Sequence, residues 1–146
     1  MRLEHLCDGE YRYASPPIVI MPYGGYEAVA FGGGDGRVTG ERLNGATRWS
    51  NFPRRREDGT FMPNITGVIE TDDGATVLYE TTGVSLPPSE GSTRRLITST
   101  VRFHAGAEAY RWLNEVVAVE EGVIDIATGA LRTRMWVCSP DAALAT

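Results

Sequence analysis

One stretch of the sequence constrains the fold more than any other: residues 65–82, ITGVIETDDGATVLYETT. Two runs rich in Val, Ile, Thr and Tyr flank the dipeptide Asp73-Gly74. This dipeptide suits a two-residue type I′ turn, because Asp and Gly tolerate positive φ. The stretch therefore predicts a β-hairpin.

A two-residue loop also predicts the register of this hairpin. The expected pairs are Asp72 with Ala75, Thr71 with Thr76, Glu70 with Val77, Ile69 with Leu78, Val68 with Tyr79 and Gly67 with Glu80. Side chains alternate across a strand, so one face collects three large aliphatic side chains and a single charge. We expect this face to point inward; it comprises Ile65, Gly67, Ile69, Thr76, Leu78, Glu80 and Thr82. A carboxylate directed into an apolar interior is costly unless it is compensated, which draws attention to Glu80.

The composition indicates a single all-β domain. A chain of 146 residues, 42% of them hydrophobic and 23% charged, can bury a stable core without disulfide bonds or a structural metal ion. Seventeen glycines and eight prolines spread along the chain indicate many short turns, which is typical of an all-β fold. We expect one barrel domain over residues 1–138 and a flexible C-terminal tail at 139–146.

The net charge and the start of the chain narrow the partners and the location. A net charge of −5 argues against nucleic acid or an anionic membrane surface as a partner. No apolar run has the length of a membrane span, and the start, MRLEHLCDGEYRY, lacks a basic region followed by an apolar one. The expected location is therefore cytoplasmic, where Cys7 and Cys138 are expected to be free thiols. A closed barrel could bring the terminal strands together, so a disulfide is left open.

Short β-prone runs alternate with turn signals along the chain, and we count eight to ten strands. Besides the hairpin, strands are expected at 26–31, 46–51, 94–103 and 110–119, and a last hairpin around Ala127-Thr128-Gly129. The glycine run at 32–36 fails as a phosphate-binding GxGxxG motif, because Arg37 occupies the last glycine position. We interpret it as a bulged or sharply bent strand junction. The three arginines at 54–56 are expected to be solvent-exposed surface residues. Alternatively, they lie at the entrance of a cavity and attract an anionic ligand.

Several short motifs occur in one order along the chain. They are glycines at 33, 40 and 45, EDG at 57–59, IETDDGATVLYETTG at 69–83, TVRFHAG at 100–106 and YRWLN at 110–114. In these motifs the chain resembles the domain-of-unknown-function family DUF3237, over roughly residues 25 to 137. The resemblance implies a lipocalin-like or calycin-like antiparallel barrel with a central ligand cavity. It also implies cofactor-free chemistry in secondary metabolism, since a fungal member is associated with intramolecular ring closure in aromatic polyketide biosynthesis.

Two positions depart from the family's pattern. Arg48 precedes Trp49 in a shortened GATRW segment where relatives commonly have an Asp, and Glu80 stands where relatives often have a basic residue. Both positions are polar and could line the cavity, so a relative's substrate is not transferred to this chain.

Motifs for metals and cofactors are absent from the sequence. His5 and His104 are the only histidines, and neither has a second ligand at HxH or HxxxH spacing. The sequence also lacks a GxSxG turn that would present a nucleophile beside His104. We therefore expect no metal and no cofactor.

An acid/base set in a barrel remains as the candidate site. Glu80 and His104 are the expected catalytic bases, and Arg102 is expected to orient a substrate oxygen. The expected substrate-binding residues are Trp49, Trp112, Asn114 and Arg48, since Trp often walls an aromatic ligand site. Alternatively, these residues have only structural roles. The two tryptophans then fill the hydrophobic core, Glu80 forms a salt bridge with Arg102, and His104 is exposed.

Two functions are open at this point. The first is a cofactor-independent acid/base enzyme, a cyclase, isomerase or lyase, acting on a small cyclic or aromatic, oxygenated metabolite. The alternative is a non-catalytic carrier that binds a small molecule in the same cavity. An inward ionisable group favours the enzyme, because a carrier of apolar ligands gains nothing from burying a carboxylate. The sequence leaves open whether the protein is a homo-oligomer.

Overall fold

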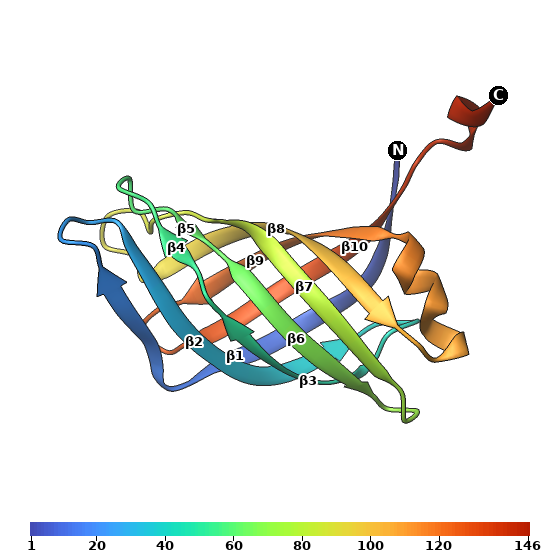
Figure 1. The fold of residues 1–146 in the computed structure, drawn as a ribbon, viewed down its shortest axis with the longest axis horizontal. Helices are drawn as coiled ribbons and strands as arrows, with labels where there is room; N and C mark the ends of the chain where they lie inside the picture. The colour runs from blue at the N-terminus through green and yellow to red at the C-terminus, as the bar shows by residue number, and fades with distance from the viewer.

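The computed structural model describes residues 1–146, except for the side chains of residues 16 and 17. It consists almost entirely of strands (Figure 1). The elements are β1 (Arg2–Pro22), β2 (Ala28–Thr39), β3 (Gly45–Asn51), β4 (Arg54–Arg55), β5 (Phe61–Met62), β6 (Asn64–Thr71), β7 (Thr76–Ser85), β8 (Arg94–Ala105), the 3-10 helix η1 (Glu108–Glu115), β9 (Val117–Asp125), β10 (Ala130–Ser139) and the 3-10 helix η2 (Ala142–Ala145).

Eight long strands close into one antiparallel barrel. The order around the barrel is β1-β2-β3-β6-β7-β8-β9-β10, and β1 pairs with β10 to complete it. The two-residue strands β4 and β5 form a side ladder between β2 and β7. The predicted all-β, single antiparallel barrel is thus confirmed, and closure gives the long strands a partner on each side.

The alternation of side chains along each strand separates the interior from the surface. In β3, Thr47, Trp49 and Asn51 are buried, whereas Arg48 and Ser50 are exposed. The same period of two runs along β8 and β10. This is the pattern of a sheet with one solvated face and one packed face.

The β6–β7 hairpin has a three-residue loop instead of the predicted two-residue loop. The N–H of Thr71 donates to the carbonyl of Ala75 at 2.8 Å, and the N–H of Gly74 donates to the carbonyl of Thr71 at 3.0 Å. Gly74 has a φ of 93°, which is the left-handed conformation that such loops place on glycine. The Asp-Gly signal therefore identified the turn but not its length.

The longer loop shifts the pairing register by one residue, so the residues of β7 that face inward are the alternate set to the predicted one. The ladder pairs Ile69 with Val77 and Gly67 with Tyr79. On β6 the predicted inward residues Ile65, Gly67 and Ile69 do face inward, but on β7 the inward residues are Val77, Tyr79, Thr81 and Ser85. The prediction that Thr76, Leu78, Glu80 and Thr82 point inward is wrong, because a slip of one residue exchanges the two faces of a strand.

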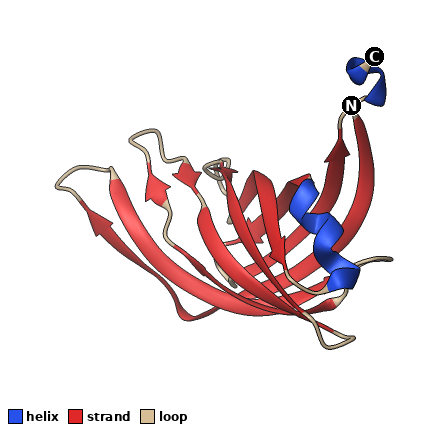
Figure 2. Cartoon of the chain, turned by 45° about the vertical axis from the view of Figure 1, so that its right-hand side comes forward, coloured by secondary structure: helices blue, strands red, loops and turns tan.

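The segment 110–119, predicted as a strand, instead begins with the helix η1. Tyr110 and Leu113 are three residues apart, so they lie on the same face of a 3-10 helix, and both are buried. Asn114 bonds both backbone groups of Ala105 at the end of β8, at 2.7 and 2.8 Å. The helix lies at one end of the barrel (Figure 2), where its buried side chains join the main apolar core. Within the described chain, neither η1 nor η2 is a helix that could cross a membrane.

The glycine run lies inside β2, opposite a bulge. The register of β1 against β2 shifts between Tyr13 and Ile18, which face Gly34 and Gly32. A Cβ at Gly34 would lie 2.0 Å from the carbonyl oxygen of Arg12, so a side chain has no room there. The irregularity predicted for this stretch is present, but the extra residues of the bulge are in β1 and not in the glycine run of β2.

The two ends of the chain meet at the β1–β10 seam. The last hairpin turns at residues 126–129, as predicted, and Gly129 has a φ of 76°. After β10 the chain projects away from the barrel and ends in η2 (Figure 1). Cys7 is buried and Cys138 is half-buried, and both are free thiols.

Candidate functional site

The barrel encloses a cavity with two adjoining parts. The outer part, of about 240 Å³, opens at the end opposite η1 and is lined mainly by Ile, Pro, Phe and Leu side chains. The inner part, of about 30 Å³, lies deeper, between Tyr11, Trp49 and Tyr79. Four residues line both parts and mark the waist between them: Ile65, Glu120, Leu131 and Thr133.

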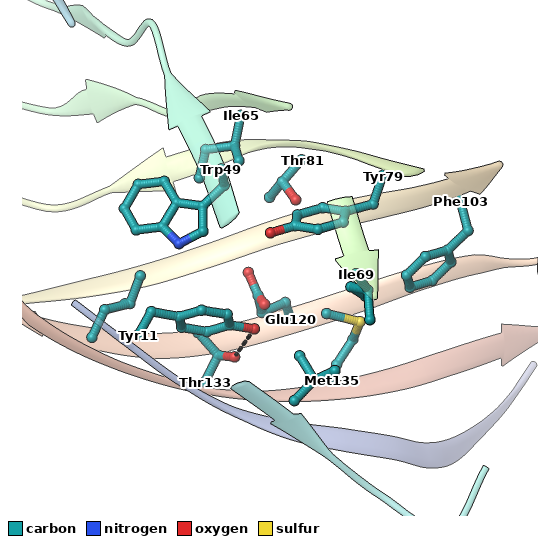
Figure 3. A pocket seen from close by; sticks show the side chains of 12 residues that line it. Tyr11, Trp49, Ile65, Ile69, Tyr79, Thr81, Phe103, Glu120, Thr133 and Met135 are labelled. Atoms are coloured by element: carbon teal, nitrogen blue, oxygen red, sulfur yellow. Dashed lines mark hydrogen bonds between the residues drawn. The ribbon is translucent and has the colours of Figure 1, made fainter. Parts of the chain in front are cut away.

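Glu120 is the acidic side chain at this waist. It lies on β9, whose inward positions alternate through Ala118, Glu120 and Gly122. Across the sheet it pairs with Ser99 of β8 and Met135 of β10. Figure 3 shows its carboxyl group pointing into the space that the aromatic side chains surround.

Burial controls the acidity of Glu120. It raises the pKa of this carboxyl from its ordinary 4.5 to about 7, and the nearby Thr133 hydroxyl offsets part of the rise. Among the described residues, no Arg or His side chain forms an ion pair with Glu120. A carboxyl group of this acidity can accept or donate a proton near neutral pH, as general acid/base catalysis requires.

Two tyrosines place neutral hydroxyl groups near Glu120. The Thr133 hydroxyl donates to the hydroxyl of Tyr11 at 3.4 Å, and the hydroxyls of Tyr79 and Thr47 are 2.7 Å apart. Burial raises the pKa of Tyr79 to about 12 and that of Tyr11 well above its ordinary value, and the negative charge of Glu120 raises both further. Both phenols therefore stay protonated and can donate hydrogen bonds to a bound oxygen.

Two buried polar atoms in the cavity wall have free hydrogen-bonding capacity. Trp49 Nε1 and Ser99 Oγ have no partner among the described residues. Trp49 is only 8% exposed and stands edge-on to Tyr11 and Tyr13. An unpaired buried donor costs roughly 1–3 kcal/mol, so a ligand oxygen that accepts from the indole N–H would be favoured.

Arg95 is a buried cation at the outer end of the cavity. It is 9% exposed, and burial lowers its pKa. Its Nε donates to Ser85 Oγ at 3.1 Å, and its Nη2 donates to the carbonyls of Ser85 and Gly59, each at 2.8 Å. All of these acceptors are neutral.

The predicted catalytic residues lie together on the outer face of the barrel, not in the cavity. His104 Nε2 and Glu80 Oε2 are 2.7 Å apart, and the two side chains are 53% and 56% exposed. Arg102 is also exposed and pairs with Glu80 in the β7–β8 ladder. The prediction that Glu80 is buried in an apolar interior is wrong, for the register reason given above.

The predicted substrate-binding residues are divided among three places. Trp49 lies in the cavity wall. Trp112 and Asn114 are both on η1: Trp112 packs on the core with the guanidinium of Arg42 over its ring at 3.6 Å, and Asn114 caps β8. Arg48 is exposed on the outer face, 3.6 Å from Glu70. Only Trp49 of the seven predicted site residues lines the interior cavity.

The sequence analysis missed Glu120, Arg95 and the two tyrosines of the inner cavity. A usable signal for Glu120 exists in VAVEEGVID (117–125), where Ala118, Glu120 and Gly122 share one face. The predicted strand ended at Val119 and left this carboxylate unassigned. Within the described residues, no group of three or more His, Cys, Asp or Glu side chains is arranged to hold a metal ion.

Comparisons with known proteins place this geometry in a family. A family model described as "protein of unknown function (DUF3237)" matches residues 1–137. No curated protein matches the chain.

Solved structures share the fold at low sequence identity. A β-barrel-like protein from Acinetobacter baumannii AYE has a TM-score of 0.80 at 18% identity, over 93% of this chain and 94% of that one. A protein of unknown function from Clostridium acetobutylicum ATCC 824 has a TM-score of 0.80 at 17% identity, over 95% and 100% of the two chains. An enzyme from Penicillium herquei has a TM-score of 0.68 at 23% identity, over 92% and 93%. These likenesses establish the barrel fold.

Proposed function

The chain belongs to the DUF3237 family, and we propose that it is an acid/base enzyme that moves a proton on a small cyclic or aromatic, oxygenated metabolite. Glu120 is the proton-transfer group in this proposal. The observation that carries it is an interior carboxyl at the waist of the cavity with a pKa of about 7. A structural core position has no need of such a group.

The surrounding groups support a specific chemistry. In its ionised form Glu120 removes a proton from a carbon next to a ligand carbonyl, and the electron pair moves to the carbonyl oxygen. That oxygen becomes more negative and accepts hydrogen bonds from Trp49 Nε1 or the phenols of Tyr11 and Tyr79. Glu120 then returns the proton to another atom, which gives an isomer. Alternatively, the new nucleophilic carbon attacks a second carbonyl carbon of the same ligand and closes a ring; the π electrons of that carbonyl move to its oxygen, which takes the proton from Glu120.

The cavity limits the size of the ligand. Its two parts, about 240 and 30 Å³, fall at or below the lower end of the roughly 300–1,000 Å³ that is usual for drug-sized ligands. A molecule of one or two rings fits these dimensions better than a long chain does. Such a ligand would have its apolar part in the outer cavity and an oxygen near the waist.

A carrier function is the second candidate. The apolar lining of the outer cavity, with side chains such as Ile97, Ile124 and Ile126, favours it. A carrier would bind the same class of ligand without needing the proton of Glu120.

Proton exchange separates these candidates. A panel of cyclic and aromatic ketones is incubated with the protein in D₂O, and loss of the proton next to the carbonyl is followed by NMR. We expect exchange with the wild type and a rate at least about a hundredfold lower with Glu120→Gln. The matched control is Glu121→Gln, since Glu121 is the adjacent residue of β9 and is exposed on the outer face.

Two further variants test the catalytic roles predicted from the sequence. Loss of exchange in Glu80→Gln or His104→Ala, with Glu120→Gln active, would shift the chemistry to the outer-face pair and contradict the proposal. Tight ligand binding without exchange by the wild type would favour the carrier.

A further inference from the structure

The outer cavity contains a single cationic side chain. Of the described residues that line it, only Arg95 is an Arg, Lys or His. The arginines that form ion pairs with acidic side chains are on the surface: Arg37 with Asp72, Arg48 with Glu70 and Arg56 with Asp58. Arg95 differs from them because it is buried and bonded only to neutral groups.

The structural bonds of Arg95 leave part of its guanidinium unused. Nε and Nη2 tie β8 to Ser85 of β7 and to the carbonyl of Gly59, which explains why an arginine can be buried there. The ring of Phe61 lies 5.0 Å from the guanidinium carbon. Among the described residues, no acceptor contacts Nη1. Two N–H groups of this largely buried cation therefore remain for a ligand.

The position of Arg95 relative to Glu120 follows from β8. Arg95, Ile97 and Ser99 occupy successive inward positions on this strand, and Ser99 pairs with Glu120. Ser99 is four residue steps along the strand from Arg95, which is about 13 Å between their Cα atoms, and the long Arg95 side chain can shorten this span. A ligand of one or two rings can therefore lie between the cation at the mouth and the carboxyl group at the waist.

We propose that Arg95 is an anion-binding subsite, and that the ligand is a cyclic or aromatic carboxylate whose acid group binds Arg95 while its ring extends toward Glu120. This inference rests on the proposed function, because it assumes that the barrel cavity is the ligand site. A carboxylate is the expected anion, since its oxygens accept charge-assisted hydrogen bonds from arginine. In a cavity lined mainly by apolar side chains this ion pair is stronger than on the surface.

The test compares a carboxylate with its neutral isostere. Binding of 2-naphthoate and of 2-naphthamide is measured at pH 7 by isothermal titration calorimetry. We expect the wild type to bind the acid at least tenfold more tightly than the amide. Arg95→Gln should bring the ratio close to one, and Arg95→Lys should retain part of the preference.

Arg54→Gln is the matched control. Arg54 is an exposed arginine on β4, at the same end of the barrel, and this variant changes the net charge by the same amount. The preference for the acid should survive in it. Loss of the preference in Arg54→Gln to the same extent as in Arg95→Gln would indicate a general charge effect and overturn the inference.

The remaining outcomes distinguish this inference from the proposed function. Equal binding of acid and amide by the wild type overturns the anion subsite, and this measurement stands even if the Arg95 variants do not fold. If ketone exchange still depends on Glu120, the proposed function survives that result. If neither probe binds and no ketone exchanges, both ideas fail.

Discussion

Gly67 lies directly opposite Tyr79 in the β6–β7 ladder, and the tyrosine ring covers it. A Cβ at Gly67 would be 2.3 Å from Cζ of Tyr79, so the ring can take this position only over a glycine. The contact places the Tyr79 hydroxyl 2.7 Å from that of Thr47, beside the inner cavity. This pair therefore shapes the space in which Glu120 lies.

Gly67→Ala should destabilise the protein and disturb the site. The added methyl group must displace the Tyr79 ring and break its bond to Thr47, and overpacking of this kind costs about 1–3 kcal/mol. Urea denaturation measures the loss. Gly106→Ala is the control, because a Cβ there meets open space, and it should change stability by less than about 0.5 kcal/mol. A Gly67→Ala protein as stable as the wild type would contradict this packing.

Glu120 should make the protein less stable as the pH rises. Between its ordinary pKa of 4.5 and its folded pKa of about 7, the folded state holds a proton that the unfolded state has lost. The contribution of Glu120 to stability is therefore highest below this window, falls through it, and is lower by up to about 3 kcal/mol above it.

Glu120→Gln should remove that pH dependence. Compared with the wild type, the variant should gain in Tm between pH 5 and pH 8, whereas Glu121→Gln on the outer face should follow the wild type. A constant difference between wild type and Glu120→Gln across this range would show that the carboxyl pKa is not raised.

The Glu120-dependent exchange rate should rise with pH and level off. The base form is populated above the pKa of about 7, so the rate should have its midpoint near pH 7. The profile is measured on the best ketone of the panel, from pH 5 to pH 9. A rate already near its plateau at pH 5 would instead indicate a solvated carboxylate with the ordinary pKa of 4.5.

Cys7 should resist alkylation in the native protein. Burial raises the pKa of its thiol to about 12, so almost none of the reactive thiolate is present at pH 8. Iodoacetamide should modify only Cys138 in the native protein and both cysteines in urea. In Cys7→Ser the thiol that reacts only in urea should be absent. Rapid labelling of Cys7 in the native protein would contradict its burial.

Local sequence determined the strands and most of the turns. Alternating side chains and the Asp73-Gly74 and Ala127-Thr128-Gly129 signals correctly predicted antiparallel hairpins, because turn chemistry and the period of two act over a few residues. The same signals, together with the family resemblance, were sufficient to predict the closed barrel. They were not sufficient for η1, where the buried pair Tyr110 and Leu113 also fits the period of a 3-10 helix.

The tertiary structure alone decided which polar side chains enter the barrel. One extra loop residue at the β6–β7 turn put Tyr79 inside and Glu80 outside, and no local preference distinguishes the two loop lengths strongly. Likewise, Glu120 and Glu121 are adjacent and chemically alike, and the pairing of β9 with β8 and β10 turns the first inward and the second outward. The alternation within a strand is local, but the choice of its buried face depends on pairing with strands that are distant in the sequence. For this reason the sequence predicted a carboxylate in the cavity, and only the closed barrel showed that it is Glu120.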